Sequence, residues 1–177
     1  MINLAFLIFC STLSAAPTRI TIHNSPPEEV IKSKGLFIIE LSAGGIGPSM
    51  EIKRKGSRKI YKIYLKDKTE GFYFGLLPPG QYQVTQVNAP YFGLPYKSSF
   101  EKDPQWQFSI DAGKTNYLGK LTIDKARKTK QVFISLRNRL AEFMVKHAKR
   151  YRSVIQKYPL TSGFSAKDKF QQRLDGE

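Results

Sequence analysis

Short stretches of alternating apolar and polar residues dominate the middle of the chain. Trp106, Phe108 and Ile110 alternate with glutamine and serine, and residues 130–136 repeat the pattern. Alternation with a period of two is typical of strands that bury one face. Glycine, proline, asparagine and aspartate separate these stretches, and no helical pattern lies between them. Residues 36–136 are therefore predicted to form seven or eight short strands in an antiparallel sandwich or barrel.

The period changes after Asn138, where apolar residues begin to recur at three- and four-residue steps until Pro159. This spacing predicts one amphipathic helix over residues 139–158, with Asn138 as its N-cap. The apolar stripe consists of Leu140, Phe143, Met144, His147, Tyr151, Val154, Ile155 and Tyr158.

The flanking segments carry weaker patterns. Pro26 and Pro27 exclude a regular central strand, so residues 17–35 are interpreted as an extended linker. Residues 160–177 are polar and weakly periodic, and are interpreted as a flexible basic tail. The predicted organisation thus runs from a signal segment over 1–16 through this linker to a sandwich over 36–136, a helix over 137–159 and the tail.

The N-terminus resembles a secretory signal. Residues 4–10 are apolar and uncharged, and residues 11–16 are mainly small. The uncharged stretch is too short to span a bilayer and is typical of a secretory signal. The alternative is a buried N-terminal strand. Cys10 as a lipid-carrying residue is disfavoured, because Ile8 and Phe9 stand where small residues are needed. We expect an exported protein that is periplasmic or associated with the outer membrane.

Composition narrows the class of protein. The chain has 177 residues, of which 41% are hydrophobic and 24% are charged, so wholesale disorder is excluded. Its single cysteine excludes a disulfide framework and any zinc site that needs several cysteines. The net charge of +15 favours acidic partners.

Residues 71–84 (GFYFGLLPPGQYQV) carry aromatic alternation followed by Leu-Pro-Pro-Gly-x-Tyr. This segment resembles the carboxypeptidase regulatory-like domain, a prealbumin-like (transthyretin-like) sandwich. Pro78 and Gly80 would form a tight connection between strands. Tyr82 would place its ring in the core while its hydroxyl reaches a backbone group.

Residues 108–119 (FSIDAGKTNYLG) are similar to a hairpin of exported bacterial members of the same group. The resemblance covers residues 36–136 and implies a seven- to eight-stranded antiparallel sandwich of the immunoglobulin or prealbumin type. It says nothing about the basic helix that follows. Most domains of this kind bind or support and do not catalyse.

Catalytic signals are sparse. The chain has two histidines, His23 and His147, and neither has the i+4 partner of a zinc hydrolase. His147 lies on the apolar stripe, where an imidazole packs or faces solvent. We therefore predict no enzymatic activity, no catalytic residue, no metal site and no cofactor.

Two groups of residues are candidates for binding. The segment 88–104 is long for a strand connection and rich in aromatic residues, which would either contact a ligand or cap the sandwich. The aromatic candidates are Tyr91, Phe92, Tyr96 and Trp106. The candidates for contacting anions are Lys53, Arg54, Lys55, Arg58 and Lys59 at a hairpin tip, and Lys146, Lys149, Arg150 and Lys157 on the helix.

These features support three hypotheses. The first is a non-enzymatic cell-envelope binding or structural protein whose basic helix contacts an anionic lipid headgroup, lipopolysaccharide, an acidic glycan or an envelope protein. The second is a carbohydrate-binding module that uses the loop aromatics. The third is a nucleic-acid-binding protein in which aromatic residues and cations are interleaved.

Overall fold

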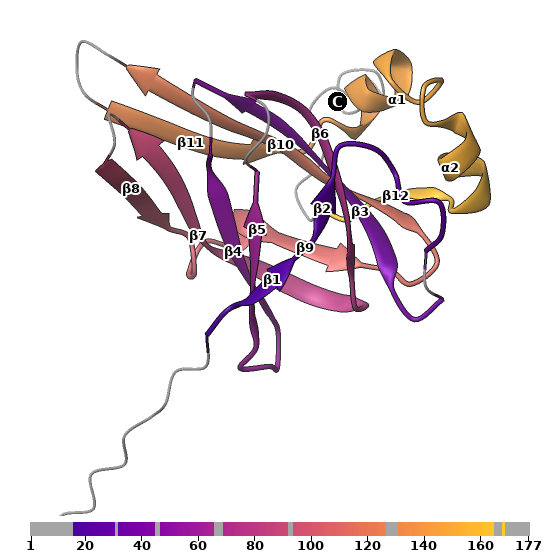
Figure 1. Cartoon of the computed structure of the whole chain (residues 1–177), viewed down its shortest axis with the longest axis horizontal. Helices are drawn as coiled ribbons and strands as arrows, with labels where there is room; N and C mark the ends of the chain where they lie inside the picture. The colour runs from indigo at the N-terminus through magenta and orange to yellow at the C-terminus, as the bar shows by residue number, and fades with distance from the viewer. Residues whose placement is uncertain are drawn as a thin grey trace, which may run out of the picture.

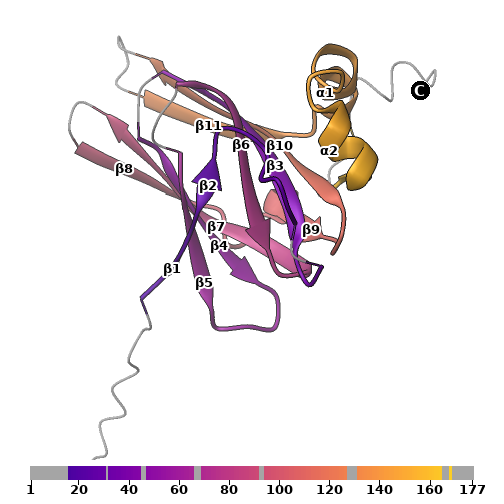
Figure 2. The same cartoon turned by 45° about the vertical axis from the view of Figure 1, so that its right-hand side comes forward.

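The computed structural model describes residues 16–30, 32–44, 47–65, 69–91, 94–126, 131–164 and 168. These residues are mainly in strands, which form two sheets (Figures 1 and 2). The first sheet, sheet A, has the order β1–β5–β4–β7–β8, with β9 also paired to β7. Its strands are β1 (Thr18–Ile20), β4 (Ser49–Arg54), β5 (Ile60–Tyr64), β7 (Gly80–Tyr91), β8 (Leu94–Ser99) and β9 (Gln107–Ile110).

The second sheet, sheet B, has the order β11–β10–β3–β6–β2, with β12 also paired to β10. Its strands are β2 (Ile22–His23), β3 (Gly35–Ala43), β6 (Glu70–Leu77), β10 (Thr115–Ala126), β11 (Gln131–Arg137) and β12 (Leu160–Ser162). Both sheets are mixed rather than purely antiparallel, because β1 runs parallel to β5, and β10 runs parallel to both β3 and β12.

The inner faces of the two sheets meet in one hydrophobic core. Phe37 and Ile39 of sheet B are fully buried in the same cluster as Ile52, Ile63 and Val84 of sheet A. The alternating burial of strands such as β5 and β9 reflects one face in this shared core, as expected. Among the described residues there are twelve strands, more than the seven or eight expected, because short flanking segments and part of the segment 88–104 also pair.

The segment predicted as an extended linker takes part in both sheets. Strand β1 extends the edge of sheet A beside β5, and β2 pairs with β6 in sheet B. Pro26 and Pro27 lie outside any strand, as their missing N–H groups require. The linker prediction is therefore wrong for residues 18–23, whose edge partners are too distant in sequence to be visible there. The predicted signal segment, including Cys10, lies outside the described residues except for Ala16.

The described part of the predicted flexible tail is ordered. Strand β12 pairs with the first residues of β10, and Phe164 bridges Phe108 with only 5% of its surface exposed. Asp168 accepts a hydrogen bond from the backbone N–H of Ala141 at 2.8 Å. Strand β11 pairs with β10 only from Lys120 onward, so β12 can pair with the preceding residues 115–117. The remainder of the tail lies outside the described residues.

The single helix predicted over 139–158 is two short helices, α1 (Leu140–Lys146) and α2 (Arg152–Lys157). Between them, turn-type hydrogen bonds join Arg150 to His147 and Tyr151 to Ala148. The turn therefore divides a helix that would be about 30 Å long into two short ones. Met144, expected on the apolar stripe, is 48% exposed.

The described part of the segment 88–104 consists largely of strands rather than a loop. Strand β8 pairs with the second half of β7, and the 3-10 helix η1 (Pro104–Trp106) follows. The Gln83 side-chain amide donates to the carbonyl oxygens of Phe100 at 2.8 Å and Asp103 at 3.0 Å, which fixes the path between β8 and η1.

Tyr82 behaves as its sequence context predicts. Its ring is 1% exposed within the core and stacks on Phe108 with centroids 5.3 Å apart. Its hydroxyl donates to the backbone oxygen of Pro78 at 2.7 Å. The tyrosine thus closes the turn between β6 and β7 from inside the sandwich.

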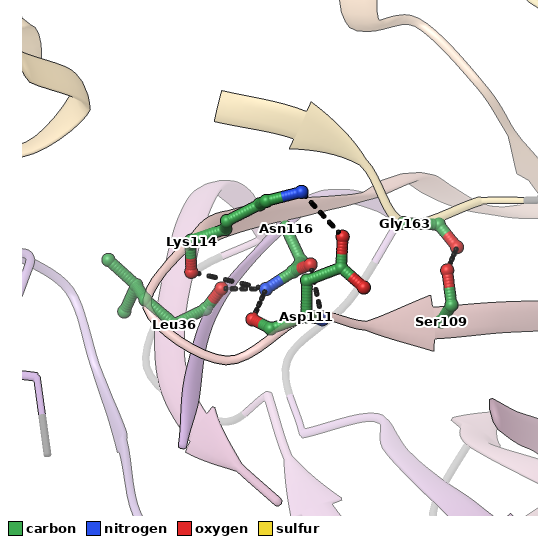
Figure 3. A network of polar contacts seen from close by, with 6 residues as sticks. All are labelled: Leu36, Ser109, Asp111, Lys114, Asn116 and Gly163. Carbon is green, nitrogen blue, oxygen red and sulfur yellow. Dashed lines mark hydrogen bonds and ion pairs between the residues drawn. The ribbon is translucent and has the colours of Figure 1, made fainter. Parts of the chain in front are cut away.

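A buried asparagine organises the turn between β9 and β10. The Asn116 amide donates to the backbone oxygens of Leu36 at 3.0 Å, Asp111 at 3.1 Å and Lys114 at 3.2 Å, and its oxygen accepts from the N–H of Asp111 at 2.9 Å (Figure 3). Nearby, the N–H of Ser109 donates to the backbone oxygen of Gly163 at 2.6 Å. One side chain therefore joins the turn to the start of β3.

Phe164→Ala tests whether the C-terminal segment belongs to the core. Loss of a buried phenylalanine ring costs about 3–5 kcal/mol of unfolding free energy. We expect a loss of this size in urea denaturation. Phe133→Ala, which removes a ring that is 58% exposed, is the control and should change stability by no more than about 0.5 kcal/mol. Equal effects of the two variants would contradict the packing of Phe164.

Alkaline pH tests the burial of Tyr82. Burial, followed by the nearby Tyr61, raises the pKa of Tyr82 to about 12. A raised folded-state pKa stabilises the fold below the ordinary tyrosine pKa of about 10, and this contribution is lost as pH rises toward 12. The free energy of unfolding should fall across this window, and fall less steeply in Tyr82→Phe. The exposed Tyr96→Phe variant should retain the full decline, and a pH-independent stability in the parent protein would refute the expectation.

Candidate anion-binding surface

An aromatic cluster on the outer face of sheet B holds α1 and α2 in place. Phe143 and Tyr151 are buried, and their rings stack with centroids 6.0 Å apart. Phe72 of β6 meets both rings edge-on at 5.4 and 5.8 Å, and Phe74 meets Tyr151 at 5.2 Å. The helices are thus packed against the sandwich (Figure 2).

The outward side of these helices is strongly basic. Residues 139–158 contain six lysine and arginine residues and one acidic residue, Glu142. Lys146 and Arg139 reach the Glu142 carboxylate at 2.7 and 3.6 Å. The hydrogen bond from Lys146, ahead of the attraction of these cations, lowers the pKa of Glu142, so this carboxylate stays charged.

The other cations of the segment are not compensated. Lys149, Arg150, Arg152 and Lys157 are exposed, and none of them forms an ion pair with a carboxylate among the residues that the structure describes. Arg150 and Lys157 lie over the rings of their neighbours Tyr151 and Tyr158, at 5.6 and 5.4 Å from the ring centroids. Their stems are therefore packed while their charges remain accessible.

Two of these cations line a hollow of about 510 Å³ between α2 and residues 24–28. Arg150, Ser153 and Lys157 occupy one face of this segment and contribute two charges and a hydroxyl group to the wall. Pro26, Pro27 and Glu28 form part of the opposite wall. The hydroxyl of Tyr158 accepts a hydrogen bond from the N–H of Val30 at 3.1 Å, which fixes the proline-containing segment beside the helix.

The basic hairpin tip lies elsewhere. It connects β4 and β5 in sheet A, whereas the helices cover the outer face of sheet B (Figure 1). Lys53, Arg54 and Lys55 line a separate hollow of about 260 Å³ together with Glu101, while Lys59 lies over Tyr61 at 5.1 Å from the ring centroid. The structure therefore does not bring the two predicted basic groups together. Arg58 at this tip is exposed.

Of the four aromatic candidates, the structure describes the side chains of Trp106 and Tyr96. Trp106 is 6% exposed, belongs to the core and stacks on Phe100 with centroids 3.6 Å apart. The prediction that Trp106 contacts a ligand is therefore wrong, because its ring fills the end of the sandwich. Tyr96 is 40% exposed on β8. Phe92 and the side chain of Tyr91 lie outside the described residues.

The two histidines have no shared site. His147 packs on Phe72 with ring centroids 4.8 Å apart, and His23 is exposed on β2. Among the described residues, no three His, Cys, Asp or Glu side chains lie close enough to hold a metal ion. No helix in the described part of the chain is long and apolar enough to cross a membrane.

The sequence indicated only some of the residues that line the hollow beside α2. It identified Arg150 and Lys157, but Ser153 and residues 24–28 enter the wall only through tertiary contacts. The i, i+3, i+7 spacing of Arg150, Ser153 and Lys157 was the available signal.

Comparison of the chain with protein-family models, curated proteins and solved structures finds no match.

Proposed function

We propose that this chain is a non-enzymatic, exported cell-envelope protein that binds an anionic surface through its C-terminal helices. The observation that carries the proposal is the hollow beside α2, where Arg150 and Lys157 face the same space with no carboxylate in ion-pair contact among the described residues. Cations held in this way attract phosphate groups by charge and by hydrogen bonding. Ser153 adds a hydroxyl donor at the same wall.

The neighbouring surface of α1 favours a lipid layer as the anionic surface. Val145 is 79% exposed and Met144 is 48% exposed, and Lys146 and Lys149 follow them in sequence. Exposed apolar side chains beside cations are typical of helices that lie in the headgroup region of a membrane. The ligand class that we assign is therefore a phosphate-bearing headgroup, of a phospholipid or of lipopolysaccharide.

The family assignment and the compartment are part of the same proposal. The Tyr82 hydroxyl bond to Pro78 and the two packed sheets support a likeness to the carboxypeptidase regulatory-like, prealbumin-like domains. The apolar run over residues 4–10 supports export to the periplasm or outer membrane. A sandwich of this kind would present the helices on a rigid support.

Binding to vesicles tests the proposal. The protein should bind vesicles that contain phosphatidylglycerol and not vesicles of phosphatidylcholine alone, with an affinity that falls as salt is added. Each cation near an anionic surface contributes about 1 kcal/mol, so Arg150→Gln with Lys157→Gln should weaken binding roughly 30-fold. Vesicle co-sedimentation and titration over a range of salt concentrations measure this effect.

Two matched variants sharpen the result. Lys53→Gln with Lys55→Gln removes the same charge from the hairpin tip and should leave affinity nearly unchanged. Glu28→Gln removes the negative charge from the wall of the hollow and should strengthen binding. Equal losses in the two double variants would indicate attraction by net charge alone and overturn the assigned site. Tighter binding to single-stranded DNA than to anionic vesicles would favour the nucleic-acid alternative.

A further inference from the structure

The alternation of inward- and outward-facing side chains along β10 is interrupted at Leu118–Gly119. In a regular strand, Tyr117 and Lys120 would point to opposite faces. Here Tyr117 belongs to the outer aromatic cluster, whereas Leu118 and Leu121 both belong to the inner core. The register against β3 shifts between Tyr117 and Lys120, which marks a β-bulge. The bulge turns Lys120 and the alternate residues after it onto the outer face.

Gly119 makes this bulge possible. Its φ of +98° lies in the left-handed region, and a Cβ atom at this position would lie 2.7 Å from the backbone oxygen of Arg137. A side chain is therefore excluded by both conformation and space. Bulges of this kind often re-aim side chains beside binding sites.

Beyond the bulge, the β10–β11 hairpin carries three cross-strand pairs on its outer face. Lys120 pairs with Arg137, Thr122 with Ser135, and Asp124 with Phe133. From Lys120 to Asp124 this surface is about 14 Å long, since each residue of a strand advances about 3.4 Å. Charged, hydroxyl and aromatic groups thus follow one another along a single strip.

A polar hollow of about 310 Å³ lies over this strip and reaches the start of α1. Its volume falls within the range of small-molecule sites, roughly 300–1,000 Å³. The lining residues are Lys120, Thr122, Asp124, Ser135, Arg137, Arg139 and Glu142. All of them carry polar side chains that can donate or accept hydrogen bonds.

The charges around this hollow are largely balanced, unlike those at α2. Lys120 lies 2.8 Å from Glu40, and Arg139 lies 3.6 Å from Glu142. Asp124 adds a further carboxylate at the other end of the strip. Such a surface gives no net attraction for an anion, but it offers charged donors and acceptors to a ligand with many hydroxyl groups.

Phe133 supplies an apolar platform at the Asp124 end. It is 58% exposed and lies directly across from Asp124 on the outer face. An aromatic ring beside a carboxylate suits a sugar, because the C–H face of the sugar ring packs on the aromatic ring while its hydroxyl groups donate to the carboxylate.

We propose that the outer face of the β10–β11 hairpin binds a neutral carbohydrate. One sugar ring packs on Phe133 and donates to Asp124, and the next reaches the hydroxyl groups of Thr122 and Ser135. Arg137 donates to the far end of the chain of sugars. This site is separate from the hollow beside α2 and does not depend on the function proposed there.

Titration of the full folded protein with maltotriose, cellotriose, mannotriose and chitotriose tests the site. Two-dimensional NMR of the backbone amides should show shifts centred on residues 120–124 and 133–137 for at least one of these sugars. Phe133→Ala and Asp124→Asn should each weaken that binding roughly tenfold or more, because each removes a principal contact. Both residues are exposed, so folding is retained and is verified by the same spectra.

Tyr96→Ala is the matched control, because it removes another exposed ring from sheet A and should leave sugar binding unchanged. Affinity should change less than about twofold between about 50 and 500 mM salt, since the ligand is uncharged. Absence of binding by every sugar, or binding that survives both Phe133→Ala and Asp124→Asn, would overturn the assignment. Loss of vesicle binding in the Arg150 and Lys157 variants would leave it unaffected.

Discussion

The buried amide of Asn116 is the contact on which the arrangement of sheet B depends. It contacts three carbonyl oxygens and one N–H group from two separate segments, so both its amide nitrogen and its oxygen are hydrogen-bonded in the interior. Leu36 at the start of β3 is thereby fixed beside β10, which sets the parallel register of these strands. Gly35 leaves the required space, because a Cβ there would lie 2.4 Å from the Asp111 oxygen. An apolar residue in its place would remove the side-chain partner of the Asp111 N–H and of the carbonyl oxygens that Asn116 contacts, at a cost in stability.

The outer face of strand β10 differs before and after the bulge. Its first residues pair with β12 and carry Tyr117 into the outer aromatic cluster beneath the helices. After the bulge, its outer side chains are polar and face the hollow beside α1. The outer face of sheet B is therefore divided into an apolar half that supports the helices and a polar half that is open. Because Tyr117 also donates to Glu40 at 3.3 Å, the two halves meet at one polar contact.

The sequence predicted the features that repeat locally. Period-two alternation identified the sandwich strands, and the segment ending in Tyr82 predicted a buried ring with its hydroxyl on the backbone, which the bond to Pro78 confirms. It could not predict the break between α1 and α2, because the apolar three- and four-residue spacing continues across the turn. Phe164 was likewise missed, since its place beside Phe108 depends on the pairing of β12 with an edge of β10 that β11 leaves free. At the candidate site, Arg150 and Lys157 were identified, but the opposing residues 24–28 were not.

The two candidate surfaces differ in what holds their charges. At α2 the cations have packed stems and no carboxylate in ion-pair contact among the described residues, so the cost of concentrating positive charge is relieved when a phosphate approaches. Over the hairpin, Lys120 and Arg139 already have the carboxylates of Glu40 and Glu142 as partners, so an incoming anion would have to compete with these carboxylates. The net charge of +15 is therefore not spread evenly, because the cations over the hairpin have carboxylate partners and those at α2 have none in ion-pair contact among the described residues. We therefore propose that charge compensation within the fold, rather than total charge, distinguishes the surface suited to an anion from the surface suited to a neutral ligand.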